Sequence, residues 1–414
     1  MSSILTNNGA MVALQTLKSI NKGLSETQSM ISTGKSISNA KDNAALWSIS
    51  KVMESDVKGF KAISDSLSLG ESTVAVAQNG AETITDLLTQ IKGKIVASQE
   101  QNVDREKIQT DIAALRDQIG AVAGAAQFNG LNLLSNTSKD AGSGTVDVLS
   151  SLDRTGSTGV TSSNISLRKQ DLTTTASAVG TMGTATGGSG VAVTDGTTGA
   201  VMTFTATVGA TGMEAGNSFE VGAASGLGLS EAVSYVARDG DTLSDVTSQM
   251  VDRLNAQAKK DGLQMTFSAS ATTAGQIDMK NDTGADVTVA AADVTQSAAG
   301  EVDGTIGGGL ESLRDIDVST ADGAADALAD IEGLITTAID SAASFGSARG
   351  RIETQSDFVS KLTDSLKSGI GSIVDANMEE TSARLQALQV QQQLGVQSLS
   401  IANQAPQSIL SLFR

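Results

Sequence analysis

The residue types that most often carry out catalysis or bind metals are scarce in this chain of 414 residues. It contains no histidine and no cysteine, which excludes Ser–His–Asp and Cys–His catalysis, thiolate chemistry and disulfides. The commonest general base and the commonest zinc ligand are therefore both absent. The adjacent carboxylates Glu379 and Glu380 are of a type that performs acid–base work. Because no neighbouring motif forms a cleft, we interpret them as part of a solvated helix face.

Three short motifs partly match ligand-binding loops. Thr33–Ser36 ends like a phosphate-binding loop, but Ser29 stands where the first glycine is required and no strand precedes it, so we predict a helix-ending turn. Gly187–Gly190 suggests a calcium-binding glycine repeat, but Ala192 occupies the aspartate position. Asp315–Asp317 begins like a calcium loop and lacks the glycine and the closing glutamate. We therefore expect no catalytic residue, no cofactor, no metal site and no enzymatic activity.

Composition and charge narrow the class of protein. Only 2% of residues are aromatic, so burial must come from many small aliphatic contacts along helices or small sheets, which favours an elongated molecule. A formal net charge of −18 argues against nucleic-acid binding, which depends on Lys and Arg neutralising phosphates, and against an anionic membrane surface. No apolar run is long enough to span a membrane, and the first residues do not resemble a Sec signal peptide.

Helical periodicity dominates both ends of the chain. Apolar spacing predicts a helix over residues 4–34, a second over 44–98 and a shorter one up to about residue 122. The 44–98 segment keeps strict 3–4 spacing over five heptads, which is typical of a coiled-coil-like bundle. Its seam consists of Phe60, Ile63, Leu67, Gly70, Val74, Ala77, Ala81, Ile84, Leu88, Ile91 and Ile95. The helical pattern returns from Leu328 to Leu399, with one slip near Ala348.

The middle of the chain has a different pattern. Residues 173–310 are rich in Thr, Gly, Ala and Asp and hold 15 Asp and Glu against 5 Lys and Arg, as a solvated outer surface would. One helix is expected at about 242–259, where Thr242 and Asp245 are placed as a capping box. Short alternating runs predict strands, at Val146–Leu149, Asn164–Arg168, Val201–Val208, Met265–Ser268, Gln276–Lys280 and Asp286–Ala290. The arrangement is nested, with helices outside in sequence and strands inside.

Four segments resemble bacterial flagellin. Ser36–Ser50 is similar to the family's "NSAKDDAAGLAIS" signature, and Gln127–Gly130 reads QFNG like its turn. Ser347–Glu353 is similar to "SARSRIED", and Asn403–Arg414 to "NQVPQNVLSLLR". The resemblance covers roughly residues 1–140 and 320–414. Trp47 departs from it, because the family usually has a small apolar residue there.

The resemblance implies a fold that is mainly α with a β-rich insertion (α+β). It implies an inner-core helical domain from residues 1–42 and 375–414, and an outer-core helical domain with a small β region from 43–172 and 311–374. A variable, surface-exposed lobe of strands plus one helix would occupy 173–310.

The resemblance also implies a function, a location and a set of partners. The chain would be the subunit that polymerises into the flagellar filament for swimming motility, extracellular and exported unfolded by the flagellar type III apparatus. Its partners would be other flagellin copies, including sister flagellins, hook-associated and filament-cap proteins, and an export chaperone. The alternative is a hook–filament junction protein, which has similar ends; a type III tip or needle component is a more distant alternative.

Two groups of apolar residues are expected to carry assembly, because terminal helices with one unmatched seam cannot bury it alone and would order on polymerisation. The predicted polymer interface comprises Leu17, Ile20, Leu24, Ile31, Leu385, Leu388, Leu399, Ile409 and Leu412. The predicted outer-core packing residues are Phe60, Leu67, Val74, Leu88, Ile91, Ile95, Ile352, Val359, Leu366 and Ile373.

One segment departs from flagellins that the vertebrate Toll-like receptor recognises. Leu88–Val96 aligns with the family's "LQRVRELAV", in which an Arg and a Leu belong to the recognition surface. Gln90 and Lys94 replace them here, while Asp111 keeps the acidic partner on the next helix. We therefore expect recognition by this receptor to be altered.

Overall fold

The computed structural model describes residues 7–155, 159–183, 188–205, 213–223, 226–297 and 301–412, with only the helical course given for 405–412. The chain divides into two compact units, Met1–Ser64 with Asp357–Arg414, and Asp65–Ser356. Each unit combines segments from both halves of the sequence. Helical ends and a strand-rich middle confirm the predicted fold class, whereas the division into three regions stays a prediction.

The first unit is helical. Helix α1 (Asn8–Thr33) begins where the Asn7 side chain accepts a hydrogen bond from the Ala10 amide, and it ends at Gly34, whose φ of 68° is left-handed. Helix α6 (Met378–Leu412) returns beside it. The start of α2 (Ala44–Ser98) and the end of α5 (Ala321–Val374) complete the unit. The turn after α1 is the helix-ending turn predicted for Thr33–Ser36.

The second unit contains the rest of α2, all of α3 (Arg105–Ala125) and α5 up to Ser356. The α2 seam from Leu67 to Ile95 lies fully buried, and Ile112, Ile119 and Ile352 are at most 2% exposed. Aliphatic side chains repeated every three or four residues thus form the core of the helical part. The predicted bounds of 44–98 for the long helix are confirmed.

Two pairs of strands lie between helix α3 and the lobe in the sequence. β1 (Gln127–Phe128) pairs with β2 (Leu131–Asn132) around the turn at Asn129 and Gly130. β3 (Thr145–Thr155) pairs antiparallel with β4 (Gly159–Arg168), with a shift of register between Leu149 and Ser151. This hairpin contains both strands predicted at 146–149 and 164–168, and it is longer than either.

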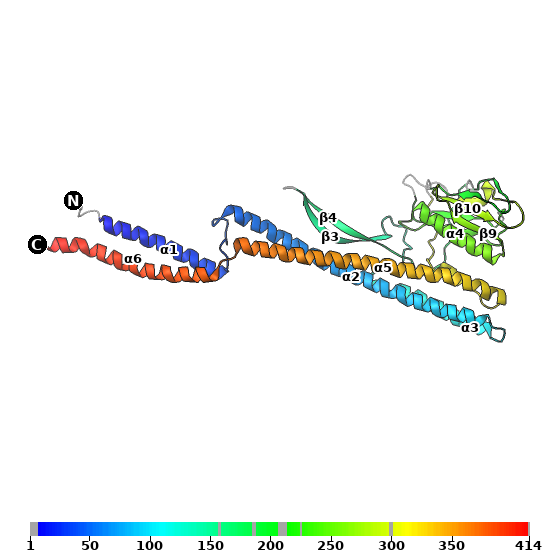
Figure 1. Ribbon diagram of the computed structural model, residues 1–414, viewed down its shortest axis with the longest axis horizontal. Helices are drawn as coiled ribbons and strands as arrows, with labels where there is room; N and C mark the ends of the chain where they lie inside the picture. Colours follow the sequence, from blue (N-terminus) through cyan, green and yellow to red (C-terminus); the bar gives the residue numbers. More distant parts are fainter. Residues whose placement is uncertain are drawn as a thin grey trace. The chain divides into compact units, whose positions relative to one another are not determined.

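The lobe has a core of its own, formed by two three-stranded sheets and one helix. Helix α4 (Leu243–Lys260) begins with the predicted capping box of Thr242 and Asp245. It lies beside strands of both sheets, and Figure 1 shows it next to β9 and β10. One sheet has the order β6 (Thr198–Thr203), β10 (Gln276–Asn281), β9 (Met265–Ala269). The other has the order β12 (Val294–Gln296), β7 (Ser218–Val221), β8 (Val233–Val236).

Most of the strands predicted in the lobe are present. β9 and β10 match the predicted bounds within one residue. β6 starts earlier than predicted, and residues 206–208 of that prediction lie outside the described residues. The run at 286–290 contains the short β11 (Val287–Thr288), which pairs with β5 (Ala192–Val193).

Candidate assembly surface

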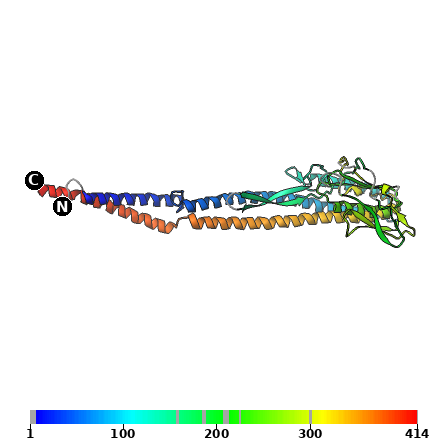
Figure 2. The ribbon, with the colours of Figure 1, turned by 90° about the horizontal axis from the view of Figure 1, so that it is seen from above.

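Helices α1 and α6 form an antiparallel pair that joins the two ends of the sequence. Figures 1 and 2 show them side by side. The Asn7 side-chain nitrogen donates to the Ala402 backbone carbonyl over 2.8 Å, and the Gln392 side-chain nitrogen donates to the Asn21 side-chain oxygen over 2.7 Å. These bonds connect residues more than 370 positions apart, so the pair is a genuine tertiary contact and fixes the register of the two helices.

Small residues let the two helices approach. A Cβ placed at Gly23 would lie 3.6 Å from both Leu388 methyl groups, and one at Gly395 would lie 3.3 Å from a Leu17 methyl. The structure therefore brings together residues of the predicted polymer interface from both ends of the chain. The side chains of Leu17, Ile20, Leu24, Ile31, Leu385, Leu388 and Leu399 are all only half-buried. The side chains of Ile409 and Leu412 lie outside the described residues.

A second apolar stripe on α6 was missed by the sequence analysis. Val390, Leu394 and Ile401 follow one another at spacings of four and seven residues, so they share one helix face. At 100° per residue this face lies roughly 150° around the helix from the face containing Leu388 and Leu399. Their exposed fractions are 56%, 56% and 68%. The signal was present in the sequence, but the strong 3–4 spacing of the other stripe concealed it.

The start of α1 also exposes apolar side chains. Met11 is 61% exposed, Val12 64% and Leu14 43%. Scattered exposed apolar residues are normal on soluble proteins, whereas contiguous ones mark interaction surfaces. The exposed residues of α1 and the second stripe of α6 lie on two helices that contact each other, and we call these two sets of residues the candidate assembly surface.

The connections next to this pair are held by backbone hydrogen bonds. The Ser36 amide donates to the Val374 carbonyl over 2.7 Å, and the Ala376 amide donates to the Gly34 carbonyl over 2.9 Å. The first bond ties the segment after α1 to the last residue of α5, and the second ties the end of α1 to the segment before α6. Lys35 also pairs with Glu54 at 3.5 Å.

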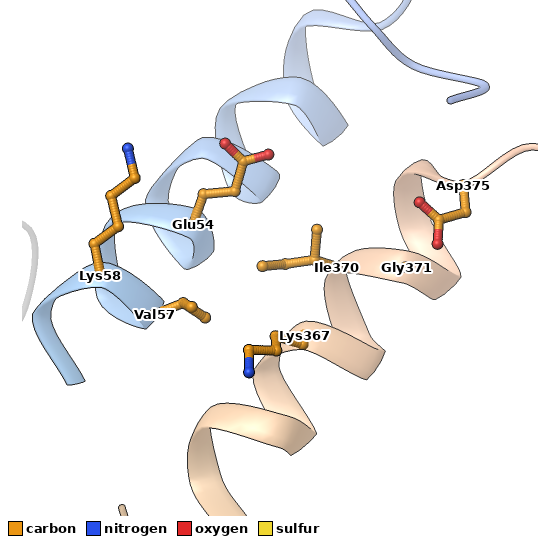
Figure 3. A pocket seen from close by; sticks show the side chains of 7 residues that line it. All are labelled: Glu54, Val57, Lys58, Lys367, Ile370, Gly371 and Asp375. Carbon is orange, nitrogen blue, oxygen red and sulfur yellow. The ribbon is translucent and has the colours of Figure 1, made fainter. Parts of the chain in front are cut away.

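An open pocket of about 310 Å³ lies in the same unit between α2 and α5. Figure 3 shows Val57 and Ile370 extending toward each other from the two helices. Glu54 and Lys367 are among the charged residues that line it, and hydrogen bonding from Lys51 lowers the pKa of Glu54. Among the described residues, no cluster of acidic side chains has the geometry of a metal site.

The predicted outer-core packing residues fall into two sets. Leu67, Val74, Leu88, Ile91, Ile95 and Ile352 are fully buried in the second unit, and Val359 is 1% exposed in the first. Phe60, Leu366 and Ile373, all in the first unit, are half-buried. The half-buried set lies in the same unit as the α1–α6 pair, where burial within one molecule is incomplete.

The residues aligned with the receptor-recognition segment lie on neighbouring helices. Lys94 on α2 forms an ion pair with Asp111 on α3 at 2.5 Å, and the side chain of Gln90 is exposed. The Asp111 carboxylate is thus paired within the chain.

Comparison with known proteins agrees with the architecture. The family described as the bacterial flagellin N-terminal helical region matches residues 4–139, and the bacterial flagellin C-terminal helical region matches residues 328–413. Flagellin A of Rhizobium meliloti is 38% identical over the full length of both chains, and flagellin B of the same organism is 36% identical over the full length of both. The flagellin FljM of Caulobacter vibrioides is 29% identical and covers 100% of this chain and 99% of its own.

Two solved structures show more distant similarity. FliC from Burkholderia pseudomallei has a TM-score of 0.31 and 14% identity over 68% of this chain and 99% of its own. The flagellar hook-associated protein-3 from Legionella pneumophila has a TM-score of 0.35 and 10% identity, over 78% of this chain and 98% of its own.

The family matches at both ends and the full-length relatives show that this chain belongs to the bacterial flagellin family. It is a structural subunit of the flagellar filament, and it serves motility. The full-length relatives are flagellins, so the alternative of a junction protein is not favoured. Among the described residues, no helix combines the length and apolarity that a membrane span requires.

Proposed function

We propose that copies of this chain polymerise through the candidate assembly surface, with Val390, Leu394 and Ile401 of α6 as its centre. Within one molecule, the seam that contains Leu17 and Leu388 would hold α1 against α6. Contacts with other copies of the chain would complete the burial of this seam. The observation that carries the proposal is the second, exposed apolar stripe opposite a seam that α1 already contacts.

The energetics favour assembly through this stripe. Burying one aliphatic side chain completely contributes about 1.5–3 kcal/mol. Three such side chains per subunit, repeated along a polymer, therefore supply a substantial driving force even after the entropic cost of association. A contact between two different surfaces of identical subunits generates a helical filament when its rotation does not close a ring, which matches the geometry that a flagellar filament needs.

The test replaces Leu394 by aspartate. Because Leu394 is 56% exposed, we expect the monomer to keep its helical content and thermal stability while filament formation, scored by electron microscopy and sedimentation, is lost. Gln393→Asp is the matched control, since it adds the same charge at the neighbouring exposed position. We expect Leu388→Asp also to block filaments, but with destabilisation of the α1–α6 pair. Normal filaments from Leu394→Asp would contradict the proposed surface.

We further propose that the chain is extracellular, exported unfolded by the flagellar type III apparatus, and that it contacts hook-associated and filament-cap proteins as well as sister flagellins. An export chaperone would cover the exposed apolar faces of the terminal helices before assembly. A pull-down with Leu394→Asp and with Gln393→Asp tests the chaperone contact, because only the first substitution removes an apolar side chain. Equal chaperone recovery by both variants would argue against a contact at this stripe.

We also propose that the pairing of Lys94 with Asp111 and the exposed Gln90 weaken recognition by the vertebrate receptor that binds other flagellins. Introducing the Arg and Leu of receptor-recognised flagellins, with Gln90→Arg and Lys94→Leu, would then raise receptor signalling in a reporter-cell assay. An unchanged signal would show that other residues decide recognition.

A further inference from the structure

The outer strands of the lobe sheets are covered by polar groups of the chain itself. In an antiparallel sheet, an outer strand presents unpaired amides and carbonyls that are ready to pair with a strand of another molecule. The two lobe sheets have four outer strands, β6, β9, β8 and β12. In the described residues, each of these strands has a backbone or side-chain group bonded to it from outside its sheet.

The clearest case is β9. The Phe267 amide donates to the Asn255 side-chain oxygen over 2.7 Å, and the Asn255 side-chain nitrogen donates to the Phe267 carbonyl over 3.0 Å. A side-chain amide carries one acceptor and one donor group, like a backbone peptide. Asn255, on α4, therefore occupies the place that a residue of an added strand would take opposite Phe267, the central residue of β9.

The same helix covers a second sheet. The Arg253 guanidinium, two residues earlier on α4, donates to the Ser234 carbonyl on β8 over 2.8 Å. Arg253 also forms an ion pair with Glu311 at 3.2 Å, which holds its side chain in place. Positions separated by two residues point to different sides of a helix, so α4 reaches an outer strand of each sheet.

Backbone segments cover the other two outer strands. The Ser189 amide donates to the Val201 carbonyl on β6 over 2.9 Å, and the Gly183 amide donates to the Gln296 carbonyl on β12 over 2.8 Å. The lobe thus combines covered strands on both sheets with a net negative charge.

From this arrangement we propose that Asn255 is an edge block, which prevents β9 from pairing with the lobe of a second copy of this chain. The inference goes beyond filament formation, and it concerns a contact that must not form. Subunits of one filament, and of neighbouring filaments, present many identical lobes at high local concentration. An open, uncharged β9 edge would then join lobes by strand addition, which would bundle filaments or aggregate the monomer.

The experiment compares Asn255→Leu with Asn255→Lys in the full chain. Both remove the two bonds to Phe267, but only the leucine leaves an uncharged edge, because lysine on an edge opposes strand pairing. We expect the Phe267 amide of dilute monomer to exchange with deuterium at least tenfold faster in both variants. At high concentration, only Asn255→Leu should regain protection there, scatter light and give bundled filaments in electron microscopy. Gln249→Leu makes the same amide-to-isobutyl change on α4 and should behave like the unmodified chain.

Three results would overturn the proposal. Separate filaments and a soluble monomer from Asn255→Leu, with the Phe267 amide deprotected, would show that the open edge does not pair. Equal aggregation of the leucine and lysine variants would show that a weakened lobe, and not strand pairing, is responsible. An unchanged exchange rate at Phe267 would show that Asn255 does not cover the edge. Because exchange and light scattering are measured on monomer, these readouts remain valid even if the proposed filament contacts are wrong.

Discussion

Replacing Gly70 by alanine isolates the contact between α2 and the β3–β4 hairpin. A Cβ at Gly70 would lie 2.7 and 2.8 Å from the two methyl groups of Val148, which is 5% exposed on β3. Alanine in a helix interior is normally more stable than glycine by about 0.5–1 kcal/mol. Overpacking a tight core contact costs about 1–3 kcal/mol. The clash therefore outweighs the helix preference, and we expect Gly70→Ala to lower the free energy of unfolding by about 1 kcal/mol.

Gly93→Ala is the matched control on the same helix, since no atom lies within 4 Å of a Cβ built there. Gly93→Ala should raise the free energy of unfolding by about 0.5–1 kcal/mol. The free energies of unfolding of the two variants should therefore differ by about 1–3 kcal/mol, measured by urea unfolding of the monomer followed by circular dichroism. Val148→Ala should cost less in the Gly70→Ala background than alone, because it removes the clashing methyl groups. Equal gains from Gly70→Ala and Gly93→Ala would refute the close approach of hairpin and helix.

Three further perturbations test other parts of the second unit. Burial, together with the neighbouring Asp326, raises the pKa of Asp330. The ionised Asp330 carboxylate therefore destabilises the folded protein at pH 7, and the protein regains this stability as the pH falls through the raised pKa. Asp330→Asn should raise the melting temperature at pH 7, and the difference from the unmodified protein should disappear near pH 3. Tyr235→Phe removes a buried hydroxyl that donates to Asp241 over 2.6 Å and should cost about 1–3 kcal/mol in urea unfolding. Replacing residues 175–308 by a short Gly–Ser linker should leave a chain that still folds and forms filaments in electron microscopy, and loss of filaments would assign the lobe a role in assembly.

The long helices were predictable because their signal is repeated many times. The seam of α2 contains an apolar residue every three or four positions over five heptads, so single exceptions such as Gly70 do not hide it. The capping box at Thr242 and Asp245 was predictable for a different reason, since two side chains at fixed spacing satisfy two backbone amides.

The missed elements are short and depend on contacts distant in sequence. β7 and β8 have four residues each and follow glycine-rich segments, so no window long enough to show alternation exists. Asn255 gives no sign of its role in the sequence, because its partner at Phe267 is set by the packing of α4 against β9. The second stripe of α6 was overlooked because only the structure shows which of the two apolar faces α1 covers.

The way the chain enters and leaves the lobe explains how a module so different in composition fits between coiled helices. The Leu310 amide donates to the Thr173 carbonyl over 3.1 Å, and the Ala178 and Thr305 backbones bond each other. The entering and leaving segments are therefore neighbours, and a lobe of any size between them leaves the helices where they are. The lobe also has a separate apolar core, so its surface residues can change without altering the packing of the helices. We propose that the acidic composition and the covered strands are surface features of this kind, since both would keep adjacent copies apart while the apolar helices at the chain ends would bring them together.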